Sequence, residues 1–528
     1  MVLLADKRIA ELAQDNQVKD LKIAELEAKV TWFEEQFRLA QHRQFGVSSE
    51  QAVSGQEALV FNEAEAVADT TSPEVEIEQI TYGRRKFKGQ RDIRLQNLPV
   101  EDIDYVLPED ELVCPQCSGP LHDIGVETRI EVQSIPAHQL LVHHNQHKYA
   151  CRCCQKEETT TPIVTATMPK PAFPNSLASP SVVAHIMTQK FVMGLPLYRQ
   201  EQQFEREDFD LSRQTMANWM IKGADWLKVI YDRMHQILLG KDILHADETT
   251  LQVLKEEGRA AQTASYMWLY RTGRDGPPIV LFDYQPGRSG EYPKAFLNDF
   301  AGWLHADCYG AYDRLSHDKV AIVGCLTHAR RKFDEAVKAL PASARKNPKG
   351  LPQIGLQFFG ALYKVEHDLK DATPDQRYKG RLDRSKPILD QFKIWLDDLA
   401  PKVLPKGALG MAIAYCRNNW AKLTSYLLDG RLEIDNNRAE RSIKPFVIGR
   451  KNWLFANTPR GAKASATIYS VVETAKENGL DPFKYLTYLF ETLPNIDTTD
   501  KMVLDQLLPW AADLPTNCRV PSRGAERK

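Results

Sequence analysis

The sequence predicts a multidomain α+β protein in which an α/β core carries a helical insertion, a zinc-ribbon-like module and an N-terminal coiled coil. Three observations predict this class. At 528 residues, the chain is longer than one hydrophobic core usually organises. Two Cys-x-x-Cys pairs bracket a short span. The tetrapeptide LHAD ends two similar apolar runs, at 244–247 and 304–307, and each copy finishes on an aspartate.

The composition is that of a soluble globular protein, with 43% apolar and 26% charged residues. No run of about 18 apolar residues exists, so we expect no membrane span. The start of the chain lacks the features of a secretion signal, and nine cysteines, an odd number, favour a reducing compartment. We therefore expect a cytoplasmic protein. The net charge of −2 confines any nucleic-acid surface to local patches.

Residues 1–48 are predicted to form a coiled coil. Apolar side chains from Ile9 to Phe37 recur at alternating spacings of three and four residues, and polar Asn16 and Lys19 interrupt the seam. This pattern favours self-association into a homo-oligomer. A single amphipathic helix packed on its own domain is the alternative.

Residues 49–95 read as a linker with a basic arm. The stretch 62–80 is acidic and poor in aromatic residues, as in linkers. The stretch 82–91 that follows is basic, and its Arg84, Arg85 and Lys86 can either contact DNA phosphates or lie in a solvated loop.

Residues 96–165 are predicted to form a zinc-binding module. Its four candidate ligands stand in two pairs, and such pairs on tight turns can close a tetrahedral Zn²⁺ site: Cys114, Cys117, Cys151 and Cys154. All four positions are then filled, so the zinc is structural. Cys153 is a spare thiol that can replace Cys154.

Residues 176–235 are predicted to be helical and to bind DNA. A Ser-Pro start, a proline in the first turn and a serine cap mark three short helices within 176–222. They resemble a helix-turn-helix whose last helix presents Arg213, Gln214 and Asn218 outward. A plain three-helix bundle is the alternative.

Residues 240–340 and 431–478 are predicted to form the core. Three strands, a helix, a strand, a short helical piece, a strand and a helix follow one another along 240–340. Three antiparallel strands followed by helix-linked parallel strands is the order of a ribonuclease H-like fold. Residues 341–430 show helical periodicity and are predicted to be an insertion, and 479–528 to be a helical segment and tail.

The repeated LHAD predicts a metal site. In a ribonuclease H-like sheet the first and fourth strands are neighbours, so Asp247 and Asp307 project together and can share divalent cations. Chance repetition is the alternative. A third acid is expected in 433–455, where Glu440 lies on a helix with Lys444 one turn later on the same face.

The surroundings of Glu440 are basic. A carboxylate among cations suits a phosphodiester site, and the cations expected to contact DNA there are Arg438, Arg441, Arg450 and Lys451. Asp435, read as the helix cap, and Glu433 are weaker candidates for the third acid. An exposed helix laced with salt bridges is the alternative.

These motifs together resemble the transposases of the insertion sequence 66 family, nearly from end to end. The stretches that carry the likeness include CPQC, CRCC, HADETTLQV, HADCYGAYDRL, GCLTHARRKF and DNNRAERSIKPFVIGRKNWLF. The resemblance implies a DDE active site at Asp247, Asp307 and Glu440. It also implies a Cys-x-x-His pattern, here Cys325 and His328, which we read as structural support of the site, since one Cys and one His alone leave a zinc site incomplete. For His328, catalytic assistance and a helix-start residue satisfied by hydrogen bonds are both open.

The expected reaction is metal-dependent DNA cleavage and strand transfer. We expect Asp247 to bridge two Mg²⁺ or Mn²⁺ ions about 3.5–4 Å apart, while Asp307 and Glu440 each hold one. The expected partners are the element's terminal inverted repeats, target DNA and accessory proteins of the same bacterial element, at the nucleoid. The alternatives are a nuclease or resolvase without strand transfer, and an inactive DNA-binding regulator.

Overall fold

The computed structural model describes residues 2–45, 139–150, 163–315 and 319–521. The basic arm, with Arg84, Arg85 and Lys86, lies outside the described residues. So do the four cysteines predicted to bind zinc, Cys114, Cys117, Cys151 and Cys154. Two short antiparallel strands flank the second cysteine pair, β1 (Lys148–Ala150) and β2 (Ile163–Thr165).

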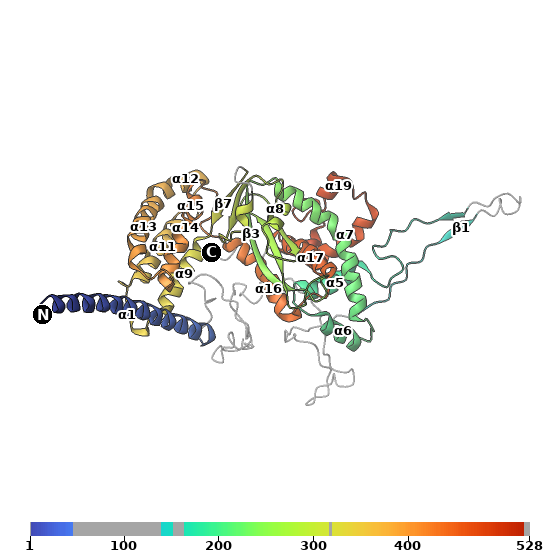
Figure 1. The fold of residues 1–528 in the computed structure, drawn as a ribbon. Helices are drawn as coiled ribbons and strands as arrows, with labels where there is room; N and C mark the ends of the chain where they lie inside the picture. Colours follow the sequence, from blue (N-terminus) through green and yellow to red (C-terminus); the bar gives the residue numbers. More distant parts are fainter. Residues whose placement is uncertain (1, 46–138, 151–162, 316–318, 522–528) are drawn as a thin grey trace, which may run out of the picture. The chain divides into compact units, whose positions relative to one another are not determined.

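A five-stranded mixed sheet forms the centre of the fold (Figure 1). Its spatial order is β5-β4-β3-β6-β7, with antiparallel pairs among the first three strands and parallel pairs from β3 to β7. The strands are β3 (Ile243–Gln252), β4 (Ala264–Thr272), β5 (Val280–Gln285), β6 (Gly302–Ala306) and β7 (Val320–Gly324). The prediction that the first and fourth strands of this region are neighbours is confirmed by the pairing of β3 with β6.

Gly302 permits the close start of this pairing. It has φ +147°, and a Cβ there would lie 2.2 Å from the carbonyl oxygen of Asp242. The same carbonyl accepts a hydrogen bond from the backbone N–H of Trp303 at 2.8 Å. Any side chain at position 302 would therefore push β6 away from β3.

Three helices precede the sheet, as the cap signals predict. They are α5 (Pro180–Phe191), α6 (Leu197–Arg206) and α7 (Arg213–Leu239). Ser179 and Ser212 cap α5 and α7, each accepting a backbone N–H with its side chain. The prediction that the last of these helices is short is wrong: α7 has 27 residues, because buried side chains recur at helical spacing from Met216 to Leu238. The three helices share one hydrophobic core with the sheet.

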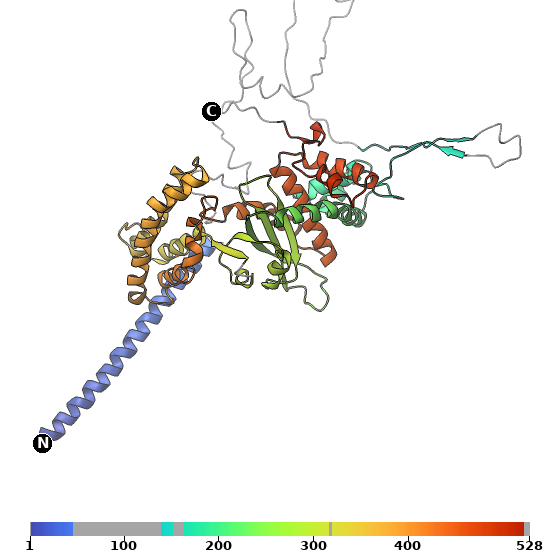
Figure 2. The ribbon, with the colours of Figure 1, turned by 90° about the horizontal axis from the view of Figure 1, so that it is seen from above.

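The predicted insertion is helical (Figure 2). Its buried apolar side chains form a second hydrophobic core with those of α9 and β7. A short helix, α8, precedes β6, and α9 follows β7. The bounds are α8 (Glu291–Phe296), α9 (Leu326–Ala339), α10 (Ala342–Arg345), α11 (Leu351–Asp368), α12 (Pro374–Gly380), a π-helical turn η3 (Arg381–Ser385), α13 (Lys386–Leu399), α14 (Ala408–Asn418) and α15 (Trp420–Thr424).

Two long helices then return to the sheet. The remaining helices are α16 (Asn437–Trp453), α17 (Pro459–Glu477), α18 (Pro482–Thr492) and α19 (Lys501–Asp505). Helix α16 packs on β3 and β4, and α17 packs on β5 and α7. The backbone after α16 also pairs with the sheet, because Ala456 forms a parallel bridge with Val253. This return places the end of α16 beside the end of β3.

The N-terminal helix α1 (Val2–Phe45) ends against the insertion side of the core. Leu39 is buried with Ala336, Ala339 and Ala408. The Arg38 side chain donates to the Ala339 carbonyl at 2.6 Å. Within the described residues, no helix is long and apolar enough to span a bilayer.

The aromatic centre of the second core generates a stability prediction. Phe333 of α9 is fully buried, and its ring lies 5.7 Å from Phe359 and 6.0 Å from Phe392 between centroids. Phe333→Ala should lower the free energy of unfolding by about 3–5 kcal/mol, because it leaves a cavity in this core. Denaturant titration followed by circular dichroism measures the change. The control Ile394→Ala, at a position 70% exposed, should change it by less than about 0.5 kcal/mol. Equal effects would contradict this account of the core.

Candidate active site

The two copies of LHAD lie in register on neighbouring strands. Leu244 pairs with Leu304 and His245 with His305 across the parallel β3–β6 ladder. Parallel strands point the same way, so the acids that follow, Asp247 and Asp307, reach the same edge of the sheet. The register brings together two of the three acids predicted from the sequence.

The third acid, Glu440, is brought to this edge by the turn before α16. The Asn436 side chain donates to the Ala246 carbonyl at 2.8 Å, and its Oδ1 lies 2.9 Å from His245 Nδ1. Asn436, not Asp435, is the residue that precedes the helix, while Asp435 accepts the Asn437 backbone N–H at 3.1 Å. Glu440 therefore lies in the first turn of a helix tied to β3 one residue before Asp247.

Negative charge is concentrated around Asp247. Burial raises its pKa well above the usual range, and the charges of Glu248, Glu440 and Asp307 raise it further. One hydrogen bond opposes this shift, from the Glu248 backbone N–H to Asp247 Oδ1 at 2.8 Å. Such a carboxylate is stabilised by a bound cation.

The three acids are near neighbours but do not all converge on one point. Their ligand oxygens do not form a group in which every pair lies within 4.8 Å. In a site that holds two cations about 3.5–4 Å apart, the oxygens that bind different cations lie further from each other than the oxygens around one cation. Oxygen-only ligands of this kind suit Mg²⁺ or Mn²⁺, so the donor set fits the cations predicted from the sequence.

Glu248 and Arg288 form a partly buried ion pair beside Asp307 that the sequence did not predict. Glu248 accepts from Arg288 Nε and from the Tyr312 hydroxyl, both at 2.8 Å, and its side chain is 2% exposed. Arg288 Nη2 lies 4.0 Å from Asp307 Oδ2, and the guanidinium lies 3.7 Å above the Tyr309 ring. In the sequence, Glu248 is noticeable only as a second acid directly after HAD. Arg288, on the loop between β5 and α8, shows no pattern that would link it to Glu248.

The histidines of the repeat stack on each other beneath the acids. The rings of His245 and His305 are fully buried, 4.2 Å apart and 8° from parallel. Burial lowers the pKa of both, to about 4 for His245, so the rings are neutral at pH 7. Glu433 lies beside them, with Oε2 3.9 Å from His245 Nε2. The stack ties β3, β6 and the turn before α16 together.

The Arg and Lys side chains predicted to contact DNA around Glu440 differ in whether they are exposed to solvent. Arg438 donates to Glu433 at 2.9 Å, and Arg450 donates to Thr249 Oγ1 at 3.0 Å, so both guanidiniums have partners within the protein. Arg441, Lys444 and Lys451 are exposed. From α9, Arg331 Nη2 lies 3.9 Å from Glu440 Oε2.

On α7, the three predicted DNA contacts Arg213, Gln214 and Asn218 are all exposed. Arg213 lies 3.8 Å from Glu201 of α6, and its guanidinium lies 5.8 Å from the Tyr198 ring centroid. The outward orientation expected from the cap and the periodicity is thus present.

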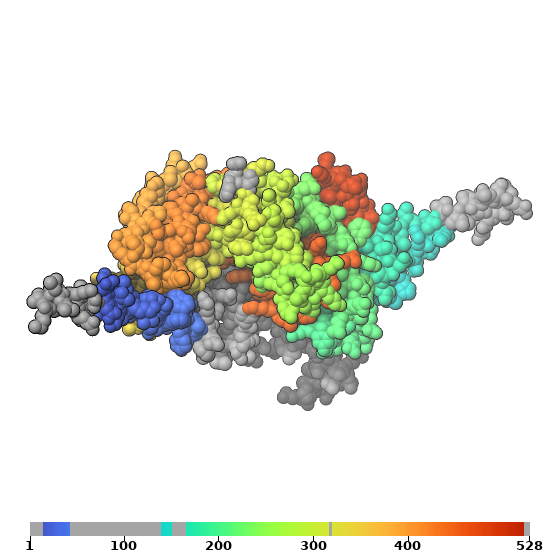
Figure 3. Space-filling view, viewed as in Figure 1, coloured from blue at the N-terminus to red at the C-terminus, as the bar shows by residue number. Residues whose placement is uncertain are grey.

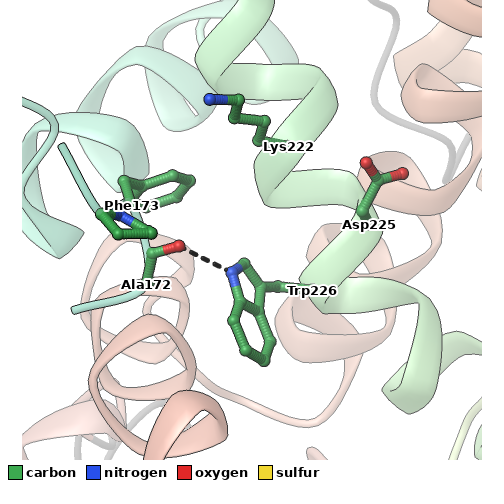
Figure 4. A pocket seen from close by; sticks show the side chains of 6 residues that line it. Ala172, Phe173, Lys222, Asp225 and Trp226 are labelled. Carbon is green, nitrogen blue, oxygen red and sulfur yellow. Dashed lines mark hydrogen bonds between the residues drawn. The ribbon is translucent and has the colours of Figure 1, made fainter. Parts of the chain in front are cut away.

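A hollow of about 420 Å³ lies between α7 and the segment before α5 (Figure 4). The Trp226 indole N–H donates to the Ala172 carbonyl across it at 2.8 Å, with Lys222 and Asp225 on the helix wall. None of the three acids lines this hollow. It is separate from the candidate active site.

Four family models match this chain. The transposase IS66 family model matches residues 175–464, and the IS66 C-terminal element matches 470–510. The zinc-finger binding domain of transposase IS66 matches 111–155, which includes all four cysteines predicted to hold zinc. A model described as transposase C of IS166 homeodomain matches 32–103.

Curated relatives cover most of the chain. The uncharacterized protein y4jD of Sinorhizobium fredii is 31% identical over 82% of this chain and 84% of its own length. The uncharacterized protein y4hP of the same organism is 27% identical over 88% of this chain and 86% of its own length. The likeness therefore extends well beyond the predicted catalytic core.

The raised pKa of Asp247 generates a stability prediction for protein without divalent cations. In the unfolded chain this carboxyl ionises near its ordinary pKa of about 3.9, whereas in the folded chain it ionises at higher pH. Stability is therefore lost as the pH rises from that value through the folded-state pKa. Asp247→Asn should raise the melting temperature at pH 7, and the gain should vanish as the pH falls toward 4.

Melting curves between pH 4 and pH 8 measure this effect. Asp275→Asn is the matched control, because Asp275 is exposed, and it should leave the curves unchanged. Destabilisation by Asp247→Asn at pH 7 would refute the claim that burial and the neighbouring carboxylates destabilise ionised Asp247.

Proposed function

This chain belongs to the transposase IS66 family, and on that premise we propose that it cuts and joins DNA ends at a site made by Asp247, Asp307 and Glu440. The observation that carries the proposal is the in-register LHAD pair, which brings two acids from segments 60 residues apart to one sheet edge. Glu440 lies near them because Asn436, directly before α16, donates a hydrogen bond to the Ala246 carbonyl of β3.

We propose further that the core is ribonuclease H-like. The sheet order, third-second-first-fourth-fifth within this region, and the change from antiparallel to parallel pairing at β3 support this. The acids then lie on the central strand, directly after its parallel neighbour, and on a helix that packs on the same sheet. The helical insertion between β7 and α16 supports the predicted domain division.

Asp247, Asp307 and Glu440 are the residues that hold the two divalent cations in this proposal. When bound, such cations activate the attacking hydroxyl and stabilise the leaving oxygen in an in-line displacement. Asp247 is the central ligand, because its strand β3 pairs with β6, which leads to Asp307, and is tied by Asn436 to the start of the helix that carries Glu440. The neighbouring carboxylates create a negative potential at the buried Asp247, and a bound cation would neutralise it.

Positively charged side chains near the acids are proposed to contact DNA phosphates. Arg441 and Lys444 are exposed on the helix that carries Glu440, and both can neutralise phosphates that flank the cleaved bond. Arg288 lies beside Asp307 with its guanidinium fixed by Glu248 and Tyr309, so it can position a phosphate without losing much side-chain entropy.

We assign DNA recognition to modules outside this core surface. The zinc-finger match at 111–155 supports structural zinc at the four cysteines, and exposed Arg213, Gln214 and Asn218 support DNA contact by α7. The substrates are then the element's ends and target DNA, at the nucleoid in the cytoplasm. Accessory proteins of the element belong to the same proposal.

Self-association through α1 is also part of the proposal. Its heptad seam is solvent-exposed: Ile23, Leu26, Val30, Phe33 and Phe37 are each at least 50% accessible. Figure 3 shows the described part of α1 uncovered on the face in view. A second copy of the helix would bury this seam as a coiled coil.

The central prediction concerns the three acids. Asp247→Asn, Asp307→Asn and Glu440→Gln should each reduce strand transfer by at least about 100-fold, because each removes a cation ligand worth several kcal/mol in the transition state. Binding to the element's ends, measured by gel shift, should persist. Joining of precleaved ends to a plasmid measures the reaction.

The exposed acid Asp275 supplies the control, since Asp275→Asn should join ends at the wild-type rate. If the Asp307→Asn protein still joins ends, the assignment of the acids is wrong. If the wild type cuts but never joins, the protein is a nuclease or resolvase.

The seam of α1 gives a separate prediction. Val30→Glu should shift the full chain toward monomer in analytical ultracentrifugation, because it places charge in the apolar seam. Leu21→Glu is the matched control, since Leu21 is 68% exposed but lies off the seam. An unchanged oligomer for Val30→Glu would rule out pairing through α1.

A further inference from the structure

Three metal-ligating side chains meet where α9 and α16 begin. The ligand atoms of Cys325, His328 and Glu440 all lie within 4.8 Å of one another. Cys325 directly precedes α9, His328 lies in its first turn, and Glu440 lies in the first turn of α16. The sequence showed the Cys-x-x-His pair as an incomplete zinc site, and the fold adds a carboxylate from 112 residues further along the chain.

Two of these atoms have no hydrogen-bond partner. His328 Nδ1 and Glu440 Oε1 are both buried from water and unpaired within the described residues. They lie 3.8 Å apart, which is too long for a hydrogen bond between them. Buried polar atoms left unpaired cost about 1–3 kcal/mol each. A cation bound between them would satisfy both.

The sulfur of Cys325 is surrounded by donors suited to a thiolate. The Asn436 backbone N–H donates to Sγ at 3.2 Å, and the His328 backbone N–H also donates to it. A cation at this place would bind the sulfur as a thiolate, as metals do at cysteine ligands.

We propose that Cys325 Sγ, His328 Nδ1 and Glu440 Oε1 bind a zinc-class cation, distinct from the oxygen-ligated cations of the proposed active site. Thiolate and imidazole select zinc over magnesium, which prefers oxygen ligands. Three protein ligands leave the fourth tetrahedral position open. The ion joins the first turns of two helices that come from different parts of the chain.

The consequence for catalysis rests on the proposed function. Glu440 Oε1 faces His328, whereas Oε2 lies toward Arg331, so the two oxygens face different partners. One oxygen can therefore hold the zinc while the other remains available to an active-site cation. Zinc then positions Glu440, and the Cys-x-x-His pair acts through it.

The experiment measures zinc per chain in the full-length protein by atomic emission, after purification without chelators. Cys325→Ser and His328→Asn should each contain one zinc fewer than wild type, whatever the zinc-finger module retains. The control Cys416→Ala should match wild type, because Cys416 is a buried thiol of α14 outside the cluster. Circular dichroism verifies that each variant is folded.

Wild-type crystals provide a test that needs no variant. Diffraction at the zinc edge should show an anomalous peak among residues 325, 328 and 440. Unchanged zinc content in both folded variants, or no peak at this place, overturns the inference. The acid substitutions at 247 and 307 should leave zinc content unchanged, so failure of the zinc site and failure of the strand-transfer proposal give different results.

Discussion

The parallel pairing of β3 with β6 is the interaction on which the candidate site depends. It aligns the two LHAD segments residue by residue, so Asp247 and Asp307 reach one edge of the sheet. The stacked rings of His245 and His305 fill the buried layer beneath them. Asn436 then fastens the start of α16 to β3 through Ala246. Three segments distant in sequence thus hold their acids together without any direct bond between carboxylates.

This arrangement costs stability. Asp247 is buried among other carboxylates, and within the described part of the chain its carboxylate has no ion pair like the one between Arg288 and Glu248. Buried like charge is unfavourable unless a cation compensates it. Such sites are typical of function, because stability alone would favour a neutral side chain there. The surrounding hydrophobic cores on either side provide the rigidity that keeps the acids in place.

Much of the fold could be predicted from periodicity and caps. The β-branched and aromatic residues of β3, β4 and β5, with turn residues after each, marked strands, and Ser179 and Ser212 marked helix starts that the structure confirms. The length of α7 could not be predicted, because only tertiary packing determines how far its buried face extends. Asn436 and Arg288 were missed for a related reason: their roles are contacts across 190 and 40 residues, with no local pattern. The third ligand beside Cys325 and His328 was invisible for the same reason.

Iron-mediated cleavage of the protein's own backbone tests the central claim most directly. Fe²⁺ that replaces Mg²⁺ at a carboxylate site reduces added hydrogen peroxide to hydroxide and a hydroxyl radical, with ascorbate regenerating Fe²⁺, and the radicals cut the chain near the bound ion. Fragments of the full-length protein should end near residues 247, 307 and 440, and excess Mg²⁺ should suppress all three cuts together. Cuts that omit one of these segments, or that Mg²⁺ suppresses separately, would show that the three acids do not share one site.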